Sequence, residues 1–131
     1  RDGKLNGLCT DWWVKGKKMT EGHYKNGKKD GLWTKWYENG KKRYQLHYKN
    51  GKRDGLFTGW HKNGHKAKEM HHKNDKRDGL WNLWYASGQK QAEGHYKNGK
   101  EDGLWTKWYS DGQKQFQERY IGGVRVSRKE F

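Results

Sequence analysis

The fold is decided by one 24-residue stretch, residues 30–53, which reads DGLWTKWYENGKKRYQLHYKNGKR. The same pattern occurs five times, in units that begin at residues 6, 30, 54, 78 and 102. Its tryptophan column contains Trp12, Trp36, Trp60, Trp84 and Trp108. A fixed period of this length is typical of architectures in which each unit is one supersecondary element stacked on the next. Residues 1–131 are therefore expected to form a single repeat array, with residues 126–131 left open as a terminal strand or a tail.

Each unit carries two turn signals separated by segments of strand length. The quoted unit has asparagine–glycine pairs at 39–40 and 50–51, and such pairs favour two-residue hairpin turns of type I′. The segments between them are rich in Trp, Tyr and Thr, which favour strands. The chain has 19 glycines and no proline, and each glycine would destabilise a helix by about 1 kcal/mol. We therefore predict an all-β fold: an elongated antiparallel sheet of five stacked 24-residue β-hairpins, with about ten strands.

The turn positions also predict how the strands align. A two-residue turn at 39–40 places Trp36 opposite Arg43 on one face of the sheet and Tyr48 opposite Gly31 on the other. An aromatic ring across from a strand glycine is a compensating pair in sheets. This alignment assigns successive side chains to alternate faces along the whole array.

The composition sets limits on the class of protein. Hydrophobic residues make up 29% of the chain, against roughly 45–50% in a typical globular domain. Nine tryptophans, eight tyrosines and three phenylalanines supply much of that fraction, so the chain is too aromatic to be disordered and too poor in aliphatic residues for an ordinary core. No apolar run approaches the length of a transmembrane helix. The net charge of +15 predicts attraction to acidic surfaces.

These residues resemble a known repeat. The run from Asp30 to Lys42, followed by the segment from His47 to Lys52, is similar to the variant MORN repeat, which occurs in many small bacterial proteins, including YwqK-type antitoxins. The resemblance extends from about Asp2 to Arg125. It implies a twisted, elongated sheet that serves as a binding scaffold. Roles implied for such proteins include protein docking, contact with anionic lipid and toxin neutralisation.

A histidine column is the first candidate for chemistry, and it contains His23, His47, His71 and His95. Equivalent residues lie two strands apart, roughly 9–10 Å, which is too far to share a zinc ion. We expect a structural ladder of contacts with the facing aspartates and the nearby glutamates, and only the pair at residues 71–72 leaves a metal conceivable. The single cysteine, Cys9, stands in a column of aromatic residues and is interpreted as a small apolar side chain. Because the polar groups recur once in every unit, we predict no enzymatic activity, no cofactor and no metal.

An aromatic face is the first candidate binding surface. One central column varies in type, which suggests contact with solvent, and aromatic side chains stand beside it. Some of these rings must stabilise the sheet, and the others are free to bind a protein, a sugar or unstacked bases. The candidate residues are Trp33, Tyr37, Trp81, Tyr85, Trp105 and Tyr109.

A basic edge is the second candidate. The first three units carry net charges of +4, +5 and +3, against 0 and +1 in the last two. Its residues fall at one set of turns: Lys25, Lys28, Lys29, Lys49, Lys52, Arg53, Lys73, Lys76 and Arg77. Such lysines either keep the sheet edge soluble or form a track for anionic headgroups.

The sequence thus predicts a non-catalytic interaction scaffold. Another protein is the expected partner, with an antitoxin or immunity role as the specific case. The alternative is a basic module that binds anionic lipid or another polyanion, such as a cell-wall polymer, and nucleic acid ranks last because no recognised nucleic-acid motif is present. The compartment stays open between cytoplasm and cell surface.

Overall fold

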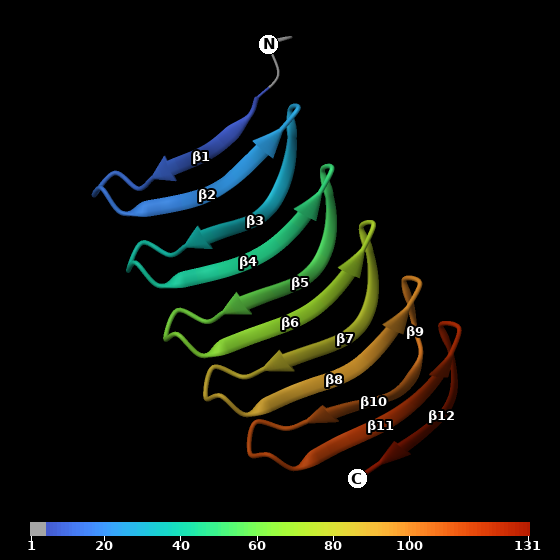
Figure 1. Cartoon of the computed structure of the whole chain (residues 1–131). Coiled ribbons are helices and arrows are strands. Elements are labelled where there is room, and N and C mark those ends of the chain that lie inside the picture. The colour runs from blue at the N-terminus through green and yellow to red at the C-terminus, as the bar shows by residue number, and fades with distance from the viewer. Residues whose placement is uncertain (1–4) are drawn as a thin grey trace.

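The computed structural model describes residues 5–131, and all regular structure in that part of the chain is β-strand. The strands form one open antiparallel sheet in chain order, as Figure 1 shows. They are β1 (Gly7–Trp12), β2 (Lys18–Lys25), β3 (Lys28–Trp36), β4 (Lys42–Lys49), β5 (Lys52–Trp60), β6 (Lys66–Lys73), β7 (Lys76–Trp84), β8 (Lys90–Lys97), β9 (Lys100–Glu101), β10 (Gly103–Trp108), β11 (Lys114–Ile121) and β12 (Val124–Glu130). The predicted fold class is confirmed.

The sheet has twelve strands, where the repeat pattern predicted about ten. One extra strand is β12, which pairs with β11 and contains most of the closing segment that the pattern left open. The other arises because β9 and β10 are two pieces of what is one strand in the preceding units. The break falls at Asp102, whose amide donates to the carbonyl of His95 (2.9 Å).

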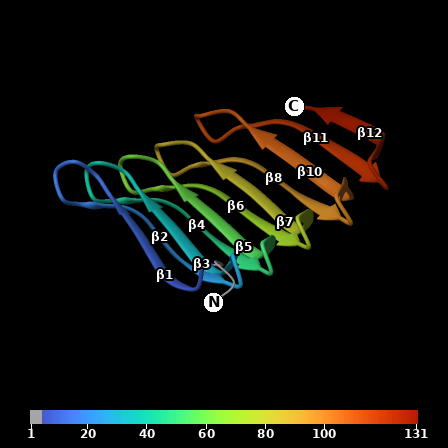
Figure 2. The same ribbon diagram turned by 90° about the horizontal axis from the view of Figure 1, so that it is seen from above.

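Each strand is bowed in the same sense, so the sheet has a concave and a convex face (Figure 1). Figure 2, seen from above, shows the hairpins following one another along the array. The concave face is called the trough below. It is a single layer of sheet, and no second layer covers it within residues 5–131.

One end of every hairpin has the predicted two-residue turn. Asn50 and Gly51 both have positive φ, 52° and 81°, as a type I′ turn requires. Lys49 and Lys52 pair directly across this turn. The same geometry occurs at residues 26–27, 74–75 and 98–99, so the turn prediction is confirmed at this end.

At the other end the prediction of a two-residue turn at 39–40 is wrong. A three-residue loop forms instead: the Tyr37 amide donates to the Lys41 carbonyl (2.8 Å), and the Gly40 amide donates to the Tyr37 carbonyl (3.0 Å). Only Gly40 has positive φ, because the side chain of Asn39 accepts the Lys41 amide (2.9 Å) and holds the asparagine in an Asx turn. In consequence Trp36 pairs with Lys42 and not with Arg43.

Away from that loop the predicted alignment holds within the β3–β4 hairpin. Tyr48 lies across Gly31, and Trp33 lies across Leu46. Between β4 and β5 the predicted alignment holds only next to the turn, because Leu46 pairs with Phe57 and the expected pair of His47 with Asp54 does not form. Leu46 pairs with Phe57 and Tyr48 pairs with Arg53, so β5 has two more residues than β4 between these pairs. The extra residues form a bulge at Gly55, which has φ 106°. Because two residues are added, alternation between the faces is preserved.

The buried residues are few, as expected for one layer of sheet. Trp33, Leu46 and Ala92 are the buried hydrophobic side chains among the described residues. A threonine column lies between the larger side chains, and the amide of Gln45 donates to the hydroxyl of Thr34 (3.1 Å). Stability therefore rests on cross-strand contacts repeated from one unit to the next.

Candidate functional site

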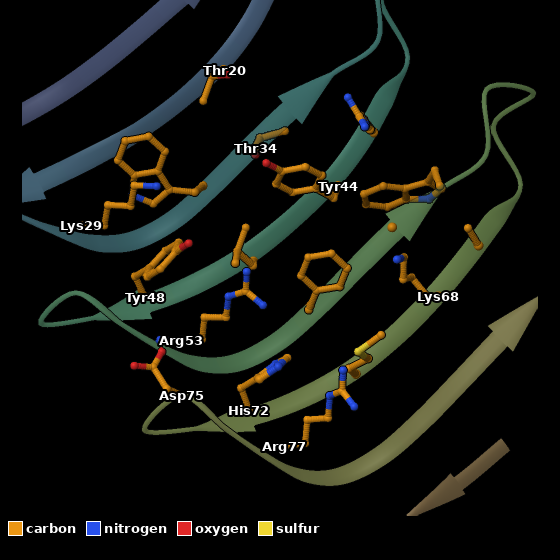
Figure 3. Close-up of a pocket in the computed structure, with 18 of the residues that line it drawn as sticks. Thr20, Lys29, Thr34, Tyr44, Tyr48, Arg53, Lys68, His72, Asp75 and Arg77 are labelled. Atoms are coloured by element: carbon orange, nitrogen blue, oxygen red, sulfur yellow. Dashed lines mark hydrogen bonds between the residues drawn. The ribbon is translucent and has the colours of Figure 1, made fainter. Parts of the chain in front are cut away.

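The trough contains one cavity of about 760 Å³ between β3 and β7, called the hollow below (Figure 3). Its lining includes apolar, aromatic and basic side chains: Tyr44, Leu46, Arg53, Phe57, Gly59, Lys68, Met70, His72 and Arg77. This volume lies within the range of about 300–1,000 Å³ typical of ligand pockets. The hollow is therefore a candidate binding site.

On either side of the hollow, the trough is filled by a tryptophan ring lying on a glycine. Trp33 of β3 covers Gly22 of β2, and Trp105 of β10 covers Gly94 of β8. A Cβ atom on either glycine would clash with the ring above it. The indole N–H of Trp33 donates to the carbonyl of His23 (3.1 Å), which fixes the ring against the backbone. Only glycine permits so close an approach.

The middle units use a different pair of residues at these positions. Leu46 stands where the flanking units have glycine, and it faces Phe57, a smaller ring than tryptophan. Two residues further on, Gly59 has no side chain where the other units carry aspartate, lysine or leucine. The hollow therefore arises from local side-chain volumes, because the backbone pairing continues unchanged through it.

The six candidate aromatic residues differ in exposure and in contacts, and Trp33 and Tyr37 line the hollow. Trp33 is only 6% exposed, whereas Tyr109, at the end of the array, is 47% exposed. The hydroxyls of Tyr37 and Tyr85 each donate to the backbone carbonyl of the tryptophan in the next unit (2.7 Å). These tyrosines tie each unit to its successor. These aromatic side chains therefore do not form one exposed binding platform, and the buried rings among them stabilise the fold.

The remaining two candidates pack on each other. The rings of Trp81 and Trp105 have centroids 4.9 Å apart, and Tyr96 meets Trp105 edge-on at 5.1 Å. Such aromatic pairs contribute about 0.5–1.5 kcal/mol beyond their buried area. The indole N–H of Trp105 is buried and has no hydrogen-bond partner in the part of the chain that the structure describes.

Three basic residues at equivalent positions of successive units, Lys29, Arg53 and Arg77, line the hollow and differ in their contacts. The amine of Lys29 lies over the rings of Trp33 (4.7 Å) and Tyr48 (5.1 Å). The guanidinium of Arg77 lies over the ring of Tyr96 and donates to its hydroxyl (3.2 Å). The guanidinium of Arg53 has no hydrogen bond, ion pair or ring contact within residues 5–131.

His72 lies between Arg53 and Arg77, as Figure 3 shows. It replaces the tyrosine found at this position in the other units, and it is 8% exposed. Burial lowers the pKa of His72 below its ordinary value, and the charges of Arg53 and Arg77 lower it further. The neutral imidazole is therefore favoured, and the two guanidiniums supply the positive charge of the hollow.

The candidate basic residues divide between an edge and the trough. Consecutive turns are hydrogen-bonded, since the Gly51 amide donates to the carbonyl of Lys29 (2.9 Å) and the Gly99 amide to that of Arg77 (2.8 Å). This stacking brings the turn lysines into one row, which contains Lys25, Lys28, Lys49, Lys52, Lys73 and Lys76. Lys29, Arg53 and Arg77 line the hollow instead. The edge lysines flank the turn directly, whereas the three residues of the hollow follow one position later and so take the other face of the sheet.

The histidine column has less contact with carboxylates than the sequence suggested. His23 pairs with Asp30 across the strands as predicted, but no ion pair joins them in the described residues. The glutamates bind lysines: Glu21 pairs with Lys18 (2.8 Å), and the third and fourth units repeat this i,i+3 pair at Glu69 and Glu93. Each lysine lies on the same face of the sheet as its glutamate, because a bulge adds one residue between them. Within residues 5–131 no group of three or more His, Cys, Asp or Glu side chains is placed to hold a metal ion.

Sequence reasoning missed a buried carboxylate at the C-terminal end of the trough. Glu118 is 8% exposed and accepts hydrogen bonds from Arg125 (2.8 Å) and Arg128 (3.2 Å) of β12. Burial by itself would raise the pKa of Glu118, but the two arginines lower it overall. The available signal was a carboxylate in a column otherwise filled by glycine, leucine and methionine.

The geometry defines an open β-hairpin repeat protein. Comparison with family models identifies the family as the MORN repeat variant, which matches residues 29–50, 53–74, 77–98 and 101–121, and the chain belongs to this family. A search of curated proteins finds no match to the chain. No helix in the described residues is long and apolar enough to cross a membrane. The family match supports a repeat scaffold of the kind often used in binding.

Proposed function

We propose that this protein is a non-catalytic scaffold that binds another protein in its trough. The observation that supports this proposal is the hollow at the middle units, a cavity of about 760 Å³. On either side of it, Trp33 and Trp105 fill the trough. A fold optimised only for its own packing would repeat the tryptophan–glycine pair in every unit. The middle units depart from that pair and leave apolar and cationic side chains accessible together.

A photo-crosslinking experiment tests the proposal. A benzoylphenylalanine at Lys68, an exposed residue lining the hollow, is expected to trap a protein partner in cells. The matched control carries the same group at Leu80, which is 45% exposed outside the hollow. Crosslinking of one protein from position 68 alone supports the proposal. Equal labelling from both positions, or none from either, contradicts it.

An antitoxin or immunity role is the specific case in which the trapped protein is a toxic enzyme. It predicts that purified chain inhibits the purified enzyme at equimolar concentration and that Phe57→Trp, which narrows the hollow, weakens the inhibition. Unimpaired enzyme activity in the saturated complex would exclude this role and leave the scaffold role in place.

A second candidate function uses the basic edge to bind anionic lipid or another polyanion. It is favoured by the pairing of lysine directly against lysine across successive turns, as at Lys49–Lys52 and Lys73–Lys76. Like charges placed opposite each other destabilise a sheet, and an anionic surface would relieve that repulsion.

Co-sedimentation with phosphatidylserine vesicles tests this second function at about 50 and about 150 mM salt. Replacing Lys49 and Lys52 by glutamine is expected to reduce binding about tenfold or more, since each basic residue near such a surface contributes about 1 kcal/mol. The control replaces Lys107 and Lys114, which carry the same charge outside the edge. Equal losses in the two variants would mean that only net charge matters.

A further inference from the structure

We infer that the hollow binds an acidic segment of the partner protein, with a carboxylate bound by Arg53 and an apolar or aromatic side chain packed against Phe57. This inference rests on the proposed function and specifies the chemistry of the occupant. Three observations support it: Arg53 has no partner, the surface beside Arg53 is apolar, and the sheet is concave at this place.

The charge of the hollow is strongly one-sided. Arg53, Arg77 and Lys68 line it, and Asp75 is the lining carboxylate. That carboxylate is already engaged, since it accepts the backbone amide of Arg53 (2.7 Å). A partner carboxylate would therefore meet a lining of net positive charge.

Arg53 is the residue that most clearly lacks a partner. Its equivalents in the neighbouring units rest on aromatic rings, Lys29 on Trp33 and Arg77 on Tyr96. At Arg53 those rings are replaced by Phe57 and His72, and no ring contact forms within residues 5–131. A guanidinium presents parallel N–H donors that match a carboxylate, so Arg53 is ready to bind one.

The floor beside Arg53 is apolar and aromatic. The rings of Tyr44 and Phe57 are stacked, with centroids 5.7 Å apart and an interplanar angle of 22°. Leu46 and Met70 complete this floor. A side chain of the partner packing on these groups would bury apolar surface at roughly 25 cal/mol per Å². This explains why the occupant should combine negative charge with an apolar or aromatic group.

The shape of the site favours a protein segment over a membrane surface. The lining of the hollow comes from strands β2 to β7 (Figure 3). These strands are bowed (Figure 1), and a planar bilayer cannot follow that curvature. The extent of the hollow over several strands suits an extended chain that offers alternating side chains.

Peptide binding to the whole protein tests the inference. The probe is a fluorescein-labelled peptide of alternating glutamate and phenylalanine, measured by fluorescence anisotropy at about 150 mM salt. Peptides with glutamine for glutamate, and with serine for phenylalanine, are the matched probes. Each replacement is expected to weaken binding about tenfold or more, since hydrogen bonds to charged groups and burial of an aromatic ring have effects of that size.

Three variants locate the site. Arg53→Met is expected to weaken binding of the glutamate–phenylalanine peptide at least about tenfold. Arg119→Met removes the same charge from an exposed residue outside the hollow and should leave binding nearly unchanged. Phe57→Trp places a tryptophan opposite Leu46, as Trp81 stands opposite Met70 in the next unit, and should weaken binding by narrowing the hollow. Urea unfolding of this variant checks that it remains folded.

The outcomes separate this inference from the proposed function. Equal binding of the glutamine peptide, equal losses in Arg53→Met and Arg119→Met, or displacement of the peptide by phosphatidylserine vesicles would each overturn the acidic-segment inference. If the peptide fails to bind while the crosslinker at position 68 still traps a protein, the scaffold function stands and the inference falls. If both experiments fail, both proposals fall.

Discussion

The flanks and the middle of the trough share one backbone and differ in what fills it. In the flanks, Trp33 and Trp105 lie directly on glycines, with no room for a Cβ atom beneath them. In the middle, the smaller ring of Phe57 faces Leu46, and the hollow opens beside it. A repeat array can therefore form a binding site by substituting two or three side chains with others of different volume, without any change in the pairing of its strands.

The largest expected effect tests whether the flanking tryptophan is a core residue. Trp33→Ala should lower the free energy of unfolding by about 3–5 kcal/mol, because the ring is 6% exposed and its removal leaves a cavity. Phe57→Ala, at the same position in the next unit, should cost clearly less because the ring already borders the hollow. Urea unfolding measures both. Equal losses would remove the energetic distinction between flank and middle.

The next effect tests the glycine beneath the ring. Gly94→Ala should destabilise the chain by about 2–3 kcal/mol, since the new methyl group would displace Trp105 from the backbone. Gly59→Ala is the matched control in the middle unit, where the new atom meets the flexible side chain of Lys68 (3.1 Å) and should be accommodated at smaller cost. Tryptophan fluorescence should shift in the first variant. Two equally stable variants would contradict the close packing described for the flanks.

A smaller effect concerns the ties between units. Tyr37→Phe should lower stability by about 1 kcal/mol, because it removes the hydrogen bond to the carbonyl of Trp60 (2.7 Å) and leaves that carbonyl without it. Tyr109→Phe removes the same hydroxyl from the last unit, where no such bond to a following unit is present in the described chain. Thermal unfolding of the two variants compares them directly. A loss of similar size at Tyr109 would show that the hydroxyls do not join the units.

The smallest effect is a pH dependence centred on His72. The folded chain holds the pKa of His72 below its ordinary value of 6.5, through burial and through Arg53 on β5 and Arg77 on β7, with Asp75 opposing and His71 adding to the shift. As pH falls through about 6.5, the unfolded chain binds a proton that the folded chain resists. Stability should therefore fall with acidification.

Urea unfolding between about pH 7.5 and pH 5.5 checks this effect. His72→Tyr restores the residue type of the other units and should remove this part of the pH dependence, whereas His71→Gln at the exposed neighbour should retain it. If His72→Tyr keeps the full dependence, another group is responsible.

Much of the fold could be predicted because its signals are local. The type I′ turns at Asn26–Gly27 and Asn50–Gly51 need only residues that accept positive φ, and the sequence shows them. The loop at residues 37–41 could not be predicted in the same way, because the Asn39 side chain competes for a backbone amide there. The split of the candidate basic residues between edge and hollow follows from the alternation of faces after the turn, but which face carries a hollow does not.

By itself, the sequence determined the period, the strand class and most of the alignment, because these follow from backbone preferences repeated every 24 residues. Only the tertiary structure decided which face is concave, which rings are buried and where the hollow lies. Those properties depend on side-chain volumes summed over neighbouring strands and on the curvature they share. In the sequence, Phe57 and Gly59 are two substitutions at repeated positions with no evident connection. The structure shows that they line one hollow together with Leu46, Arg53 and His72.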